Sequence, residues 1–360
     1  MKKFLSAFLV LGAVSCTKNV TSENDATALQ STTGMSAENA VILHGNTKFG
    51  CLPNGSFTVS KRTSVALSLN APYVRNTISM DQWNGKSGPY ESYVNSGLKV
   101  VLNVLSNQQT GKPIPFPKDM SSYRSSFNSI TDKYQPEVIV VENEEINQNY
   151  HSGPKTDYIN MLQVALDVCH SKGIKVTNGG IYGSALEILT YRYLQTKGQK
   201  RADSFSNNCM ANYQVKAAQN PGSNPDLEFD VRQMDTLLNF YVNLDYINIH
   251  PYEPFDPDLT TNSSKSAVSS ATPVVLPDLQ EYLIQRTGKP VMTNETGQRD
   301  NTSPGLVTSM LQLYDKLNFP YAIWYSGMPG DIAGAMPLYN TTTGVLQPNG
   351  TAFSTFNLTY

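Results

Sequence analysis

Short apolar segments alternate with amphipathic segments along the chain from about residue 40 onward. The apolar segments are nearly continuous and rich in β-branched residues, which is the pattern of strands buried on both faces of a parallel sheet. Between them, apolar residues recur at helical spacing, as at Tyr123, Phe127 and Ile130, and again at Tyr158 and Leu162. The pattern predicts eight strands, at 41–43, 73–78, 98–104, 138–141, 174–177, 246–249, 290–293 and 321–324.

Helix boundaries follow the same alternation. Gly173 and Gly288 each come after a predicted helix and before the next strand, and Ser303 with Pro304 provides a cap and a first-turn proline for another helix. The stretch 199–230 is rich in Asn, Ser, Pro and Gly, and we expect it to be an irregular elaboration after the fifth strand. Eight strand–helix units in about 300 residues favour an α/β fold of the (β/α)8 TIM-barrel type, in a single domain.

An open, doubly wound sheet is the main alternative among folds with parallel strands. No Gly-rich phosphate loop follows the first predicted strand, and this argues against a dinucleotide-binding fold. A barrel also requires that reactive residues lie at the carboxyl ends of its strands, where the loops gather.

The N-terminal region has the features of an export signal. Lys2 and Lys3 precede an apolar run at 4–14, which is shorter than the roughly 20 residues needed to span a bilayer. Small residues then lead to Cys16, an arrangement that resembles a bacterial lipobox and implies cleavage before Cys16 and lipidation of this residue. An ordinary secretory signal is the alternative. Residues 16–40 lack large apolar side chains, which predicts a flexible tether.

These features predict a signal peptide at 1–15, a tether at 16–40 and the barrel domain at 41–360. We expect a monomer in the bacterial cell envelope, periplasmic or on the cell surface, which contacts the membrane only through its N-terminal lipid anchor. The formal net charge of −2 and the lack of a Lys/Arg cluster argue against a nucleic-acid partner. The 20 tyrosines are compatible with a carbohydrate-binding surface, because each combines a flat apolar face with a polar tip.

Three cysteines remain if Cys16 is lipidated, so that one disulfide at most is possible in an oxidising compartment. Cys169 lies on the apolar face of a predicted helix, and we expect it to be a core thiol. A disulfide between Cys51 and Cys209 is left open.

Acidic residues follow two of the predicted strands. The fourth strand leads into Glu142, Glu144 and Glu145, and the seventh leads into Glu295. Strands four and seven lie on opposite sides of an eight-stranded ring, so their ends can bring two carboxyl groups together across the barrel mouth. Hydrolysis of a glycosidic bond requires such a pair, with one carboxyl protonated and the other ionised. We predict Glu144 and Glu295 as the pair, and the choice of Glu144 among the three acids rests on the resemblance described next. Glu142 and Glu145 are the alternative acids, which we instead expect to be a supporting group and a solvated loop acid.

The Asn143-Glu144 pair and the run Glu295-Thr296-Gly297 resemble clan A of the retaining glycoside hydrolases, and the resemblance extends over nearly the whole mature chain. It implies that Glu144 is the acid/base and Glu295 the nucleophile. Two positions depart from the clan: Glu145 stands where proline is usual, and Asn294 stands where an aromatic or acidic residue is frequent.

The same resemblance implies five candidate substrate-binding residues. Arg75 would lie near the nucleophile, Tyr252 of the His250-Pro251-Tyr252 run would hold it, and Trp324 would form the floor of the sugar site. Asn143 would hydrogen-bond the hydroxyl next to the anomeric carbon. The segment 338–353 also resembles a C-terminal run of these enzymes.

The function predicted is double-displacement hydrolysis of a β-linked oligo- or polysaccharide, without a cofactor. The four histidines lack the two-histidine spacing typical of zinc, and no Gly-x-Ser-x-Gly elbow is present. The first alternative is a non-catalytic glycan-binding protein of the cell surface on the same scaffold, and the second is a barrel hydrolase of another ester or amide. Trp83, after the second strand, is either a sugar platform or a packing residue.

Overall fold

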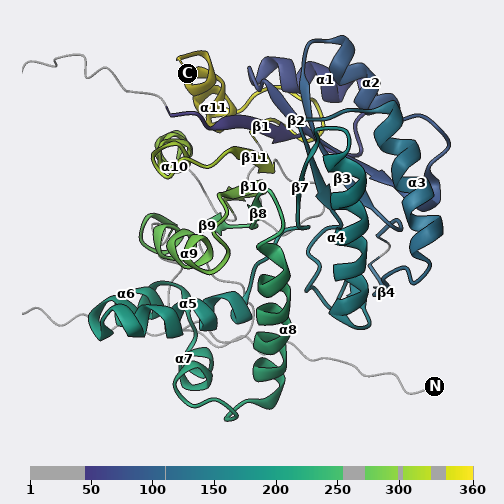
Figure 1. Cartoon of the computed structure of the whole chain (residues 1–360). Helices are drawn as coiled ribbons and strands as arrows, with labels where there is room; N and C mark the ends of the chain where they lie inside the picture. The colour runs from purple at the N-terminus through teal and green to yellow at the C-terminus, as the bar shows by residue number, and fades with distance from the viewer. Residues whose placement is uncertain (1–44, 110, 254–271, 299–302, 326–337, 360) are drawn as a thin grey trace, which may run out of the picture. The chain divides into compact units, whose positions relative to one another are not determined.

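A barrel of eight parallel strands forms the centre of the structure (Figure 1). The computed structural model describes residues 45–359 except 110, 254–271, 299–302 and 326–337. The strands lie in the order β7-β5-β3-β2-β1-β11-β10-β8, and bridges from Thr177 to Tyr246 and from Ile181 to Ile249 join the two ends. The barrel strands are β1 (Lys48–Leu52), β2 (Tyr73–Ser79), β3 (Lys99–Leu105), β5 (Val138–Val141), β7 (Lys175–Thr177), β8 (Ile247–Asn248), β10 (Val291–Gln298) and β11 (Tyr321–Tyr325).

Three short strands lie outside the ring. β9 (Tyr252–Glu253) pairs with the end of β10, and β4 (Ile114–Pro115) pairs with β6 (His151–Ser152) in a separate small sheet. All of these pairs are parallel. They lie in the segments that follow the barrel strands, so they shape the end of the barrel at which the carboxyl termini of the strands gather.

Helices follow the strands and cover the barrel. They are α1 (Val59–Ser68), α2 (Gly88–Asn95), α3 (Met120–Lys133), α4 (Lys155–His170), α5 (Ser184–Lys197), α6 (Gln199–Cys209), α7 (Asn212–Gln219), α8 (Pro225–Tyr241), α9 (Thr272–Thr287), α10 (Pro304–Lys316) and α11 (Pro348–Thr359), with a 3₁₀ turn, η1, at Met80–Gln82. Gly173 and Gly288 have positive φ just past α4 and α9, and the Ser303 side chain caps α10, as predicted.

The core has two layers. The larger one lies between the strands and the helices, and includes Phe49, Phe127 and Tyr158. The smaller one fills the barrel, with side chains such as Val101, Met292 and Ile323. At the amino-terminal ends of the strands, Glu137 accepts hydrogen bonds from Lys99 Nζ at 2.9 Å and from the hydroxyls of Tyr73 and Tyr321. The (β/α)8 fold predicted from the sequence is confirmed.

Seven of the eight predicted strands coincide with barrel strands to within a few residues. The predicted strand at 41–43 lies outside the described residues. The first barrel strand is β1, which the apolar pattern missed because Gly50 interrupts it. This glycine is required by packing: a Cβ atom at Gly50 would lie 2.5 Å from the carbonyl oxygen of Tyr73 on the neighbouring strand.

The stretch 199–230 is helical, which corrects the expectation of an irregular segment. It contains α6, α7 and the beginning of α8. Apolar residues at helical spacing, such as Ala202, Phe205 and Cys209, are buried, whereas Asp203 and Ser204 between them are exposed. Together with α5, these helices gather on one side of the barrel (Figure 1).

All three cysteines in the described part of the chain, Cys51, Cys169 and Cys209, are buried, and Cys51 and Cys169 are free thiols. The disulfide left open between Cys51 and Cys209 is therefore not formed, and the prediction of a core thiol at Cys169 is confirmed. Among the described helices, none has the length and apolar character needed to cross a bilayer. Cys16 and the predicted signal peptide and tether lie outside the described residues.

Candidate active site

Two glutamates meet at the carboxyl end of the barrel. Glu144 follows β5 and Glu295 lies on β10, and their side chains are 13% and 15% exposed. One carboxylate oxygen from each, together with a ring nitrogen of His250, lie within 4.8 Å of one another. The structure thus brings together the two carboxyl groups that the sequence analysis selected, although 150 residues of chain separate them.

Glu295 is held by two donors. Arg75 Nη1 donates to Oε2, and the Tyr252 hydroxyl donates to Oε1. Burial alone would raise the pKa of this carboxyl, but the positive charge of Arg75, the charge of His250 and the Tyr252 hydrogen bond hold it below its usual range. Glu295 is therefore ionised at neutral pH.

Arg75 connects Glu295 to the other side of the mouth. Its Nη2 atom donates to Asn103 Oδ1 at 2.6 Å and to Asn143 Oδ1 at 2.8 Å. Asn103 in turn donates to the carbonyl oxygen of Glu142 at 2.6 Å. One buried guanidinium thus orients the nucleophile candidate and the segment that presents Glu144.

Glu144 adopts a backbone conformation that is uncommon for a residue other than glycine. Its φ is 48°, and the φ of Glu142 two positions earlier is 65°. Two contacts then orient the carboxyl group: Asn147 Nδ2 donates to Oε2 at 2.8 Å, and His250 Nδ1 lies 3.2 Å from Oε1. The left-handed turns end the strand alternation and point Glu144, rather than its neighbours, into the mouth.

The tautomer of His250 follows from a chain of hydrogen bonds. Asn248 Oδ1 accepts from the backbone N–H of Asn294 at 2.9 Å, so its Nδ2 atom is the donor to Asn294 Oδ1 at 2.7 Å. Because Asn294 Oδ1 is an acceptor, His250 Nε2, at 2.8 Å, must carry a proton. His250 Nδ1 then shares one proton with the carboxyl of Glu144.

Burial and neighbouring charges act on the pKa of His250 in opposite directions. Burial alone would lower its pKa, but the negative charge of Glu295 and the contact with Glu144 outweigh burial and raise the pKa. Space for the ring depends on Gly180, where a Cβ atom would lie 2.0 Å from His250 Nε2. The φ of Gly180 is also positive, at 116°. His250 is thus a buried support for Glu144 rather than a residue that faces a sugar.

Glu142 and Glu145 point away from the mouth. Burial raises the pKa of Glu142 to about 7, although the Ser106 N–H donates to its Oε1 atom at 2.7 Å. Glu145 is fully buried, and its Oε1 atom accepts hydrogen bonds from Tyr241 and from Asn178. The expectation that Glu145 is a solvated loop acid is wrong, because the loop folds back against β7 and α8.

The two tryptophans lie outside the site. On β11, Tyr321 and Ile323 point into the barrel, so Trp324 points outward, where it is buried against Phe353 of α11. This alternation of side-chain directions along β11 corrects the prediction that Trp324 forms the floor of a sugar site. Trp83 packs edge-on against Tyr134.

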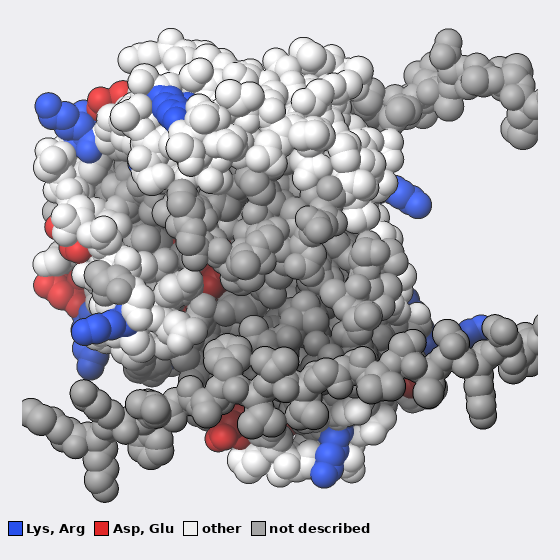
Figure 2. Space-filling model, turned by 180° about the vertical axis from the view of Figure 1, so that it is seen from behind, with Lys and Arg blue, Asp and Glu red and all other residues white. Residues whose placement is uncertain are grey.

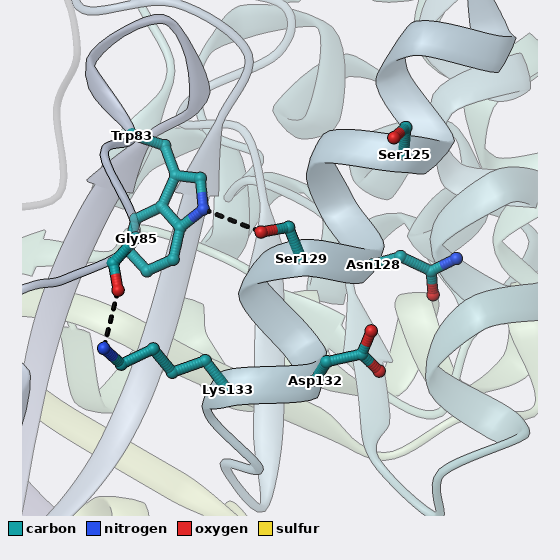
Figure 3. A pocket seen from close by; sticks show the side chains of 7 residues that line it. All are labelled: Trp83, Gly85, Ser125, Asn128, Ser129, Asp132 and Lys133. Atoms are coloured by element: carbon teal, nitrogen blue, oxygen red, sulfur yellow. Dashed lines mark hydrogen bonds between the residues drawn. The ribbon is translucent and has the colours of Figure 1, made fainter.

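Trp83 also lines a shallow surface hollow beside α3 (Figure 3). Its Nε1 atom donates to Ser129 Oγ at 3.1 Å, and Lys133 Nζ donates to the carbonyl oxygen of Gly85 at 2.6 Å. These bonds fix the loop that carries Trp83 to the flank of the barrel, and the packing alternative accounts for the indole ring.

Several contributors to the site were missed by sequence reasoning. They are amides at or near the carboxyl ends of strands: Asn103, Asn147, Asn178 and Asn248. Asn103 follows a buried apolar run in β3, Asn248 follows buried Ile247 in β8, and both asparagines are fully buried. A buried amide must find hydrogen-bond partners. A polar residue within a continuous apolar strand was the available signal.

Glu144, His250 and Glu295 are also the one cluster of three potential metal ligands found in the described part of the chain. Arg75 already supplies a positive charge at Glu295. On the face seen in Figure 2, the described Lys and Arg side chains stand apart from one another or beside acidic ones, without a continuous basic patch.

Comparison with solved structures supports the fold. The sequence matches no family model and no curated protein sequence. Among solved structures, a family 39 glycoside hydrolase from the gut symbiont Bacteroides cellulosilyticus WH2 is similar, with a TM-score of 0.53, 14% identity, and coverage of 86% of this chain and 63% of that chain. The structure of ZgEngAGH5_4 in complex with a cellotriose has a TM-score of 0.50 and 11% identity, with coverage of 87% of this chain and 96% of that chain. The chain thus spans less than two thirds of the first of these proteins, and both share its fold.

Proposed function

We propose that this protein is a retaining glycoside hydrolase of β-linked glycans, with Glu144 as the acid/base and Glu295 as the nucleophile. The observation that carries the proposal is the close approach of the two carboxyl groups, whose oxygens lie within 4.8 Å. Retaining enzymes hold their carboxyls about 5–5.5 Å apart, whereas inverting enzymes leave about 6.5–9.5 Å for a water molecule. A binding protein on the same scaffold has no need for this spacing.

The electrostatic environments of the two carboxyl groups support this division of roles. Glu295 has a lowered pKa and two donors, so it is the ionised nucleophile. Glu144 shares a proton with His250 Nδ1, so this pair holds the proton that the leaving group needs. The Asn248–Asn294 chain keeps Nδ1, and not Nε2, facing Glu144.

The reaction proceeds in two displacements. A carboxylate oxygen of Glu295 forms a bond to the anomeric carbon while the bond to the leaving oxygen breaks, and Glu144 gives its proton to that oxygen. In the second step, Glu144 takes a proton from water as the water oxygen attacks the anomeric carbon. The bond to Glu295 breaks, the product keeps its anomeric configuration, and both carboxyls return to their first states.

The test is hydrolysis of β-glucans, mannans, xylans and galactans by the protein without residues 1–40, compared with Glu144→Gln and Glu295→Gln. We expect cleavage by the parent and a loss of several orders of magnitude in both variants. Nuclear magnetic resonance of the first product should show the anomeric configuration of the substrate. Glu91→Gln, on α2 at the surface, is the matched control and should keep full activity.

Two results would contradict the proposal. A product of inverted configuration would exclude Glu295 as a nucleophile. If the parent binds glycans but cleaves none, and if binding is unchanged in both variants, the protein is instead a non-catalytic glycan-binding protein of the cell surface.

We further propose that residues 1–15 direct export and that Cys16 carries the lipid anchor, with 16–40 as the tether. The support is the charged, apolar and small-residue order of the N-terminal sequence. Expression of the full chain and of Cys16→Ala in a bacterial host tests this, since the parent should sediment with membranes and the variant should not. Recovery of both proteins in the soluble fraction would rule out the anchor.

A further inference from the structure

A cavity separate from the hollow at Trp83 opens beside Glu144, at the carboxyl end of the barrel. It has a volume of about 1050 Å³. Its walls come from the loop after β5 from Ile146 to Lys155, from the segment 182–185 after β7 and from the first turns of α8 from Leu227 to Gln233. Pro113 also lines it. The wall formed by α8 belongs to the group of helices α6, α7 and α8, which together span 199–241.

The cavity is linked directly to the acid/base candidate. Asn147 lines it, and Asn147 Nδ2 donates to Glu144 Oε2 at 2.8 Å. The other oxygen of Glu144 contacts His250, on the side of Glu295. Since Glu144 protonates the leaving oxygen, the space beyond Asn147 is where the leaving part of a glycan would extend.

The lining combines an apolar surface with hydrogen-bonding groups. Phe229 is 52% exposed, which is a large fraction for a phenylalanine, and Tyr182 of the segment 182–185 also lines the cavity. Gln148 and Gln233 add amide groups, and Asp230 adds a carboxylate that accepts from Gln148 Nε2 at 3.4 Å. An aromatic face with amides at its edge suits a sugar ring, which has apolar C–H faces and hydroxyls around its rim.

The charged groups in the wall are already engaged. Lys155 Nζ donates to the carbonyl oxygen of Glu145 at 2.8 Å and lies over the ring of Phe116. The His151 ring stacks on the same Phe116 and donates from Nε2 to the carbonyl oxygen of Asn143 at 2.8 Å. Burial lowers the pKa of His151 to about 4, so it is neutral. This chemistry favours an uncharged, polyhydroxylated ligand over an anionic one.

We propose that this cavity binds the sugar units on the leaving-group side of the scissile bond, and that the protein therefore cleaves within glycan chains rather than at single terminal sugars. The inference rests on the proposed function of Glu144. The cavity volume of about 1050 Å³ slightly exceeds the roughly 300–1,000 Å³ range typical of pockets for drug-sized ligands, so the cavity takes more than one sugar unit.

The test is a length series of neutral β-1,4-gluco-, β-1,3-gluco- and β-1,4-manno-oligosaccharides, from two to six units. Hydrolysis is measured with the parent, Phe229→Ala and Gln233→Ala. Titration calorimetry with the same sugars uses Glu295→Gln, alone and combined with each cavity substitution. Tyr213→Ala is the matched control, because Tyr213 is a 41% exposed aromatic residue on α7 that does not line the cavity.

We expect kcat/KM and affinity to rise with chain length in the parent, and Phe229→Ala to weaken binding of the longest sugars about tenfold. The loss should shrink as the sugars shorten, and Tyr213→Ala should match the parent. Equal losses at every length, or no loss in either cavity variant, would overturn the inference while hydrolysis itself stands. Release of single terminal sugars at a rate independent of length would also overturn it.

The proposed function can fail separately. If no sugar is hydrolysed but Phe229→Ala still weakens binding in a length-dependent way, the cavity is a glycan site and the catalytic assignment is wrong. If no sugar is hydrolysed and none binds, both proposals are refuted.

Discussion

The Nε2 atom of His250 lies 2.8 Å from Oδ1 of Asn294, the residue that precedes the nucleophile candidate. Asn248 orients the amide of Asn294 so that Asn294 Oδ1 accepts, and the imidazole of His250 must therefore carry a proton on Nε2. The consequence reaches Glu144, which meets the other ring nitrogen. Asn294, which is fully buried, thus influences through His250 how the acid/base candidate shares its proton.

Asn294→Leu should lower kcat about tenfold to a hundredfold and change KM less. The substitution leaves the buried Nε2–H of His250 without an acceptor, a cost of about 1–3 kcal/mol, and frees the ring to present the other tautomer. Asn294→Asp keeps the acceptor but adds a negative charge, which favours the protonated forms of His250 and Glu295. Both limbs of its pH–rate profile should therefore move to higher pH. If Asn294→Asp has the same pH–rate profile as the parent, the hydrogen bonds that link Asn294 to His250 do not influence the reaction.

Tyr252→Phe should reduce kcat/KM by about tenfold, because Glu295 loses a hydrogen bond to its charged form. The pKa of Glu295 is lowered in the folded protein, and loss of the donor moves it back up. The acidic limb of the pH–rate profile should shift to higher pH, while the basic limb stays. Measurement of kcat/KM across the pH range checks this, and an unmoved acidic limb would contradict the role of Tyr252.

Glu142→Gln should stabilise the protein at higher pH and leave hydrolysis intact. The folded-state pKa of Glu142 is raised from 4.5 to about 7, so the folded state holds a proton that the unfolded state has released between these values. Stability from this group is complete below the unfolded pKa and is lost as pH rises through about 7. Urea unfolding at about pH 5 and about pH 8 should show that the free energy of unfolding of the variant increases relative to that of the parent as pH rises. Loss of activity in this variant would instead revive Glu142 as the acid.

Glu137→Gln should destabilise the barrel at its amino-terminal end without affecting the mouth. Burial alone would raise the pKa of Glu137, but hydrogen bonds from Lys48, Lys99 and Tyr321 lower it from 4.5 to about 2. The stabilisation is therefore present above the unfolded pKa and disappears as pH falls toward about 2.

The Glu137 side chain is 39% exposed, so we expect a loss of about 1 kcal/mol at neutral pH. Urea unfolding of parent and variant should show curves that converge under acidic conditions. A difference that persists undiminished at low pH would indicate a packing defect rather than loss of the charge cluster.

The sequence by itself determined the order of the barrel and the two carboxyl positions. Strands buried on both faces are apolar where they pass through the barrel, so β5 and the beginning of β10 stand out. The residues that follow such apolar stretches must reach the same end of the barrel. These grounds place Glu295 and the group Glu142, Glu144 and Glu145 at that end, because their positions depend on the strands that carry them, and the resemblance of the Asn143-Glu144 pair predicted Glu144 among the three. The missed strand β1 shows the limit: Gly50 is explained only by the approach of Tyr73.

Only the tertiary structure decided which of three neighbouring glutamates faces the mouth and which way Trp324 points. Glu142, Glu144 and Glu145 differ through two left-handed backbone turns and through partners remote in sequence, such as Ser106, His250 and Tyr241. The direction of Trp324 depends on the register of β11 against β1. Such outcomes are set by hydrogen bonds and packing between distant segments, whose energies a local pattern does not contain.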